Sequence, residues 1–185
     1  MGTVVAIAAE RGVAIAADTS AVEGGTVTSR RLGRVFDFGS TGAGVVGDPS
    51  DIQAFERQLD AELKRWQLER EKQVEIDAVA RIAARLTDEA PVDAAVGARD
   101  STGTASLREV GTDGHVFENG RIALGSGAET ALGHLETADP GPAPDDVEAT
   151  ARETVELVME RDVDTGDDID SWSLGNASEA PTGDA

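Results

Sequence analysis

The sequence predicts an α+β fold, a four-layer αββα sandwich in which two antiparallel sheets stack face to face and helices cover each outer side. Two observations support this prediction. A β-rich block is followed by two helices, and this order then repeats once along the chain. Asp-Gly and Asn-Gly turns separate several of the strands, which is typical of hairpins. At 185 residues the chain has the length of one domain, and we expect that domain to span residues 1–174, followed by a disordered acidic tail over 175–185.

The chain opens with a predicted hairpin. The runs Val4–Ala9 and Val13–Ala17 consist of small and β-branched apolar residues, and Glu10-Arg11-Gly12 between them suits a tight turn. Because these runs are apolar almost throughout, we expect both faces of the two strands to be buried. Further short strands are predicted at 26–29, 34–38 and 40–47.

Two amphipathic helices should follow as one layer. Ser50 and Gln53 have the spacing of a capping box, and they open a helix that runs to about Arg70. Its apolar residues recur every three or four positions, and the segment Ile76–Leu86 repeats that pattern.

The second half of the chain repeats the order of the first. Strands are predicted at 92–99, 104–110, 115–117 and 121–124. A third helix should begin after Gly127 and end near Glu136, and a fourth, capped by Asp145, should reach about Arg161.

The composition is strongly acidic. There are 36 acidic and 16 basic residues, a net charge of −20, which predicts a protein from a salt-loving cytoplasm because salt screens self-repulsion. The same charge argues against nucleic acid and anionic membrane partners. Cysteine is absent, and His115 and His134 do not have the spacing of metal ligands, so neither a metal nor another cofactor is expected. No apolar run approaches the roughly 18 residues of a membrane span.

Several motifs in order resemble those of proteasome β-type subunits, which belong to the N-terminal nucleophile hydrolases. They are Gly12–Asp18, Ala43–Asp48, Gly125–Gly127 and Arg161–Gly166, together with the long helix rich in Arg and Glu. The resemblance covers about residues 2–174 and implies the N-terminal nucleophile hydrolase fold. It also implies stacked rings built with copies of the chain or with other proteasome-type subunits, and unfolded polypeptide as the substrate of an active member.

In that family the nucleophile is the hydroxyl of an N-terminal threonine, whose own α-amine is the general base. By resemblance Asp18 is the aspartate that positions a nearby lysine, and Gly44 supplies the backbone N–H of the oxyanion hole. The supporting triad of the family corresponds to Ser126, Asp162 and Thr165. Counting back without a gap places Gly2 at the nucleophile position, and the lysine position falls on Arg34.

Two functional hypotheses follow. In the first, the chain is a ring-forming structural or regulatory paralogue without peptidase activity, because Gly2 has no hydroxyl and arginine does not shuttle protons as lysine does. In the second, cleavage after Gly2 exposes Thr3 as the nucleophile of an active threonine-type endopeptidase. Thr3 lies one residue further along the strand, and such a slip turns a side chain to the opposite face.

Two further hypotheses have less support. Proteasome α subunits carry a helical extension before the first strand, which this sequence does not show, and an unrelated amidase of the same fold would need Ser, Cys or Thr where Gly2 stands. If a substrate pocket exists, we expect Ala21, Leu32 and Val46 to make it small and apolar.

Overall fold

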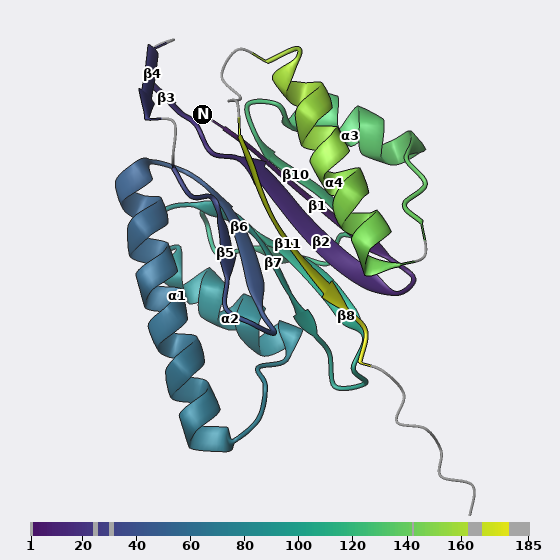
Figure 1. Cartoon of the computed structure of the whole chain (residues 1–185). Helices are drawn as coiled ribbons and strands as arrows, with labels where there is room; N and C mark the ends of the chain where they lie inside the picture. Colours follow the sequence, from purple (N-terminus) through teal and green to yellow (C-terminus); the bar gives the residue numbers. More distant parts are fainter. Residues whose placement is uncertain (1, 24–25, 30–31, 142, 163–167, 178–185) are drawn as a thin grey trace, which may run out of the picture.

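The computed structural model describes residues 2–23, 26–29, 32–141, 143–162 and 168–177, with only the backbone described for 21–23 and 26–29. Figure 1 shows most of the strands at the centre, with helices on both outer sides.

One sheet is built around the N-terminal hairpin. β1 (Thr3–Ala9) and β2 (Gly12–Asp18) are its central strands, and β10 (Arg121–Gly125) and β11 (Ile169–Gly175) are its edges, in the order β10-β1-β2-β11. All neighbours are antiparallel. The predicted hairpin is confirmed, and the residues of β2 are buried throughout.

The second sheet has five antiparallel strands in chain order. They are β5 (Val35–Asp37), β6 (Gly42–Val46), β7 (Asp93–Arg99), β8 (Ala105–Val110) and β9 (Val116–Phe117). A separate two-stranded sheet pairs β3 (Ala21–Glu23) with β4 (Thr26–Ser29).

The helices form the outer layers. α1 (Pro49–Arg70) and α2 (Ile76–Leu86) lie on the second sheet, and α3 (Ala128–Thr137) and α4 (Pro144–Met159) lie on the first. Three apolar clusters fill the spaces between layers: one beneath α1 and α2, one between the sheets, and one beneath α3 and α4. The predicted four-layer sandwich is therefore confirmed.

Three local expectations need correction. The N-cap of α1 is Asp48, two residues before the proposed cap Ser50, because Pro49 suits the first helical position. α4 likewise begins at Pro144 rather than after an Asp145 cap. β11 was not predicted, and it continues through Gly175, one residue into the segment where a tail was expected. Residues 178–185 of that predicted tail lie outside the described residues.

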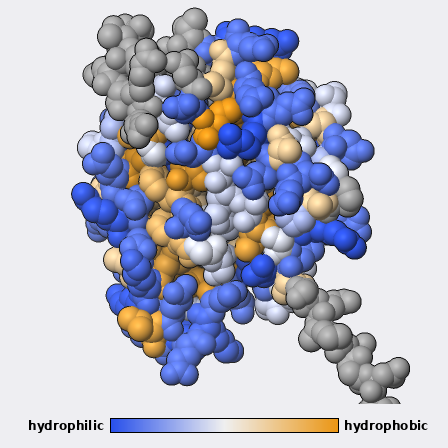
Figure 2. All heavy atoms as spheres, viewed as in Figure 1, coloured by the Kyte–Doolittle hydropathy of each residue, from blue (hydrophilic) through white to orange (hydrophobic). Residues whose placement is uncertain are grey.

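Polar side chains dominate the visible face of the molecule. On the face shown in Figure 2 hydrophilic residues cover most of both helical layers, and apolar atoms are visible mainly between α1 and the strands. Among the described residues, the exposed large apolar side chains are Leu68, Val116, Phe117 and Leu132.

Candidate active site

The start of β1 is held by Asp18 at the end of β2 and by the turn after β10. The N–H of Thr3 donates to Oδ1 of Asp18 at 2.6 Å, and the carbonyl of Gly2 accepts from the N–H of Ser126 at 3.3 Å. Gly125 has a φ of +93°, and a Cβ there would collide with the carbonyl oxygen of Gly2. Glycine is thus required at this close approach of two backbones.

Asp18 and Arg34 form a buried ion pair beside this backbone. Nε of Arg34 lies 3.6 Å from Oδ1 of Asp18, and their side chains are 3% and 0% exposed. Nη2 of Arg34 donates to the carbonyl of Ser20 at 2.6 Å, and the N–H of Ser20 donates to Oδ2 of Asp18 at 3.3 Å. Burial lowers the pKa of Arg34, and the charge of Asp18 opposes that effect.

Positions 2 and 3 face opposite sides of the first sheet. A side chain at position 2 would point at Asp18 and Arg34, because a Cβ on Gly2 would collide with Nε of Arg34 and Oδ1 of Asp18. The Thr3 hydroxyl instead accepts a hydrogen bond from the N–H of Gly127 at 3.1 Å. Thr3 is fully buried, on the same side as Val5 and Ile7, which pack beneath α3 and α4.

The other residues assigned by resemblance lie around this centre or outside the described part of the chain. The hydroxyl of Ser126 donates to Oδ2 of Asp162 at 2.6 Å, and Ser126 also holds the Gly2 carbonyl through its N–H. Gly44 lies in β6 beside Val45, whose N–H donates to the carbonyl of Arg34 at 2.9 Å. Thr165 lies outside the described residues.

The structure places two of the three residues expected to line an apolar pocket, Leu32 and Val46. Leu32 belongs to the cluster beneath α1 and α2, Val46 belongs to the cluster between the sheets, and both are buried. The side chain of Ala21 lies outside the described atoms.

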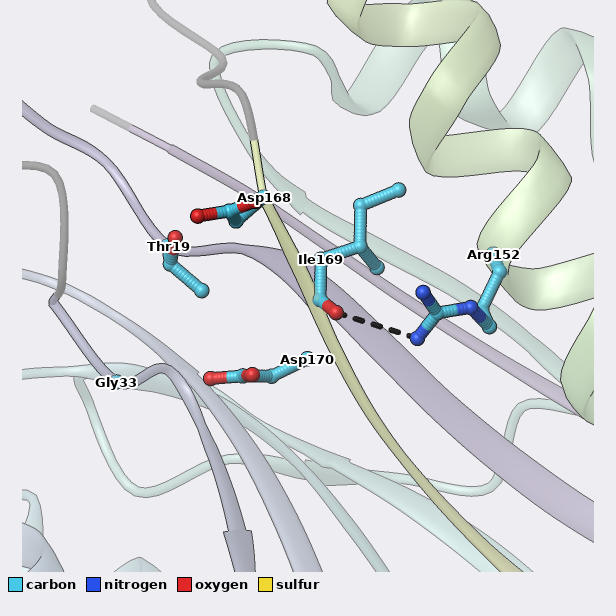
Figure 3. A pocket seen from close by; sticks show the side chains of 6 residues that line it. All are labelled: Thr19, Gly33, Arg152, Asp168, Ile169 and Asp170. Atoms are coloured by element: carbon cyan, nitrogen blue, oxygen red, sulfur yellow. Dashed lines mark hydrogen bonds between the residues drawn. The ribbon is translucent and has the colours of Figure 1, made fainter.

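A polar cavity of about 570 Å³ is lined in part by Thr19 and Gly33, the chain neighbours of Asp18 and Arg34. Its lining residues are shown in Figure 3: Thr19, Gly33, Arg152, Asp168, Ile169 and Asp170. Arg152 is engaged there, because its Nη1 donates to the carbonyl of Ile169 at 3.2 Å and to the hydroxyl of Ser171 at 2.9 Å. Asp168 and Asp170 point away from Arg152, towards Thr19 and Gly33 (Figure 3).

A neighbouring carboxylate completes this polar network. Glu148 on α4 accepts from the hydroxyls of Ser173 and Ser171, at 2.5 and 2.7 Å. These hydrogen bonds, that of Ser173 first, lower the pKa of Glu148, and the charge of Arg152 acts in the same direction. The network fastens α4 to the edge strand β11.

The described residues offer neither a metal site nor a membrane-spanning helix. They contain no group of three or more His, Cys, Asp or Glu side chains placed to hold a metal ion. None of the helices described in this part of the chain is long and apolar enough to cross a membrane.

Ser20 and Gly127 were not among the predicted site residues. Ser20 contacts both members of the ion pair through its backbone, and Gly127 binds the Thr3 hydroxyl. Both residues act through backbone groups, so their residue types do not indicate these contacts in the sequence. Only the adjacency of Ser20 to Asp18, and the Gly125-Ser126-Gly127 motif, could have indicated them.

The two stacked sheets, the outer helix pairs and the buried start of β1 beside Asp18 and Arg34 define the class of proteins with the N-terminal nucleophile hydrolase fold. A family model described as proteasome subunit matches residues 1–173. The chain therefore belongs to the proteasome subunit family.

Similar curated proteins carry the name proteasome subunit beta 1. That of Desulfurococcus amylolyticus is 30% identical over 176 residues, which are 91% of this chain and 87% of the relative. That of Hyperthermus butylicus is 29% identical over 167 residues, 85% and 81% of the two chains. That of Haloterrigena turkmenica is 29% identical over 173 residues, 90% and 71%. These relatives place the chain among β-type subunits, whose family implies assembly in rings with other proteasome subunits.

Proposed function

We propose that this chain is a proteasome β-type subunit without peptidase activity at its own site, which serves as a structural or regulatory member of a ring. The observation that carries the proposal is the direction of position 2. A side chain there would face Asp18 and Arg34, and the residue present is Gly2, which has none. The place that resemblance gives to the nucleophile therefore holds no hydroxyl.

The surroundings of Thr3 support the same proposal. A nucleophile must lie within reach of its general base and of the oxyanion donors. The Thr3 hydroxyl is fully buried against Gly127 on the helix-facing side of β1. Gly44 lies on the other side, since a Cβ on it would come within 2.6 Å of Val4 and Ile15 in the space between the sheets.

The substitution at the lysine position acts in the same direction. Lysine can lose and regain a proton when its pKa is lowered, whereas arginine stays protonated in proteins. Arg34 keeps the positive charge beside Asp18, and this accounts for the retention of the pair as a structural element.

Partners and surroundings also belong to this proposal. We expect the chain to assemble with copies of itself or with other proteasome-type subunits in stacked rings, in a saline cytoplasm. The family match supports ring assembly, and the net charge of −20 supports a saline environment.

The intact mass of the purified protein, measured together with hydrolysis of fluorogenic peptides, tests the proposal. We expect a chain that still includes Gly2 and no turnover above a buffer control. A chain beginning at Thr3 with turnover that Thr3→Ala abolishes would instead establish the active endopeptidase using Thr3. Thr41→Ala, which alters a buried threonine outside the site, is the matched control for that variant.

A further inference from the structure

We propose that the Arg34 guanidinium fills the space which a side chain at position 2 would need, so that Gly2 and Arg34 form a steric pair that closes the candidate active site. This inference rests on the proposed function in treating position 2 as the nucleophile position. It adds that the site, besides lacking a hydroxyl, is filled by the Arg34 side chain. A nucleophile therefore cannot be restored by changing position 2 alone.

The geometry at Gly2 carries the first step. A Cβ on Gly2 would collide with Nε of Arg34, and it would lie 2.6 Å from Cζ of the same side chain. Real Cβ atoms essentially never lie within 3.0 Å of such an atom. The third close atom is Oδ1 of Asp18, so a side chain at position 2 would collide with both members of the ion pair.

The second step is that neither side chain of the ion pair can easily move away from position 2. Arg34 is 3% exposed, its Nη2 donates to the carbonyl of Ser20, and its Nε is paired with Asp18. Asp18 is fully buried and accepts from the N–H groups of Thr3 and Ser20. In a close-packed interior, an added methyl group then forces off-rotamer side chains or a backbone shift.

The third step concerns the polar atoms of Arg34. Nε and Nη1 are buried and make no hydrogen bond, which is unusual for buried polar groups. The hydrogen bond of Nη2 to Ser20 and the charge beside Asp18 therefore explain only part of this guanidinium. Its volume, which occupies the space beside a residue without a side chain, explains the rest.

A double-mutant cycle of thermal unfolding tests the pair, with Gly2→Ala, Arg34→Lys and the double variant in the full chain at one salt and protein concentration. We expect Gly2→Ala alone to lower the midpoint by about 5 °C. In the Arg34→Lys background the same change should lower it by less than half as much. Lysine has no Nη2 to hold it on the carbonyl of Ser20, so its Cε and Nζ, which stand where Nε and Cζ do, can move away from position 2 and the Asp18 carboxylate can turn with the ammonium.

Gly42→Ala is the matched control. Gly42 is also a buried glycine, and a Cβ there would collide with the side chain of Trp172 rather than with Arg34. Its effect should be the same in the wild-type and Arg34→Lys backgrounds, because the two sites share no contact.

Each outcome decides the inference. A Gly2→Ala variant as stable as the wild type, or an equal loss in both backgrounds, would overturn it. If Gly2→Ala alone fails to fold, folding of the double variant supports the pair and failure of both overturns it. Peptide hydrolysis by the wild-type protein would overturn the proposed function while leaving the outcome of this cycle unchanged, so the two failures are distinguishable.

Discussion

Thr3 connects two parts of the molecule through different atoms. Its N–H binds Asp18 on the hairpin, and its hydroxyl accepts the N–H of Gly127 at the start of α3. A side-chain oxygen that accepts from the start of a helix satisfies a donor that has no partner within the helix. Thr3 can thus be explained as a structural residue that anchors α3 to β1.

Replacing Thr3 with valine tests this role, because valine has nearly the same shape and no oxygen. We expect the free energy of unfolding to fall by about 1–3 kcal/mol, since the buried N–H of Gly127 would lose its acceptor. Urea denaturation measures the change. Thr3→Ser keeps the oxygen and should retain most of the stability, so equal losses for valine and serine would contradict the anchoring role.

At the scale of single residues, the sequence indicated the two members of the ion pair but not the collision at position 2. The resemblance indicated Asp18 and Arg34, and the structure brings these two together. Their separation of 16 positions along the chain would not have indicated a contact by itself. The collision between Arg34 and position 2 is a property of packed volumes, which follow from the folded backbone and not from a motif.

At the scale of elements, Trp172 joins the two sheets. It lies on β11 at 5% exposure in the cluster between the sheets. A Cβ on Gly42 of β6 would collide with its indole, and one on Gly97 of β7 would lie 2.7 Å from it. These two glycines on neighbouring strands leave the space that the indole fills.

Trp172→Ala should therefore lower the free energy of unfolding by about 3–5 kcal/mol, because it removes a large buried side chain and leaves a cavity between the sheets. Chemical denaturation followed by circular dichroism measures this loss. Leu68→Ala, at a residue 83% exposed on α1, is the control and should leave the stability unchanged. A tryptophan variant as stable as this control would show that β11 is held by other contacts.

A comparison of α2 with β11 shows why part of the fold could be predicted from the sequence and part could not. The residues Ile76–Leu86 repeat apolar side chains at helical spacing, and α2 has the predicted bounds. β11 lacks a simple alternation, since Ile169 packs beneath α4 whereas Trp172 and Leu174 face the second sheet, with polar residues between them. Its pairing with β2 depends on the folded sheet and leaves a weak local signal.

At the scale of the whole molecule, charge is the dominant property. The net charge is −20, and the face shown in Figure 2 is largely hydrophilic over both helical layers. Subunits of like charge repel one another when they assemble, and salt weakens this repulsion over a distance of roughly 10 Å at 0.1 M and 3 Å at 1 M. The stability of a ring built from such subunits should therefore increase with salt concentration.

Light scattering coupled to size exclusion tests this expectation at two salt concentrations. We expect a large assembly at about 2 M KCl and dissociation towards smaller species at about 0.1 M, because unscreened repulsion then acts across every subunit contact. Non-ionic sucrose at equal osmolality is the control, and it should not replace the salt if charge screening is the cause. An assembly of the same size at both salt concentrations would show that apolar contacts outweigh the charge. A monomer at both would contradict homo-oligomeric assembly and leave rings formed with other proteasome subunits as the form to be tested by mixing.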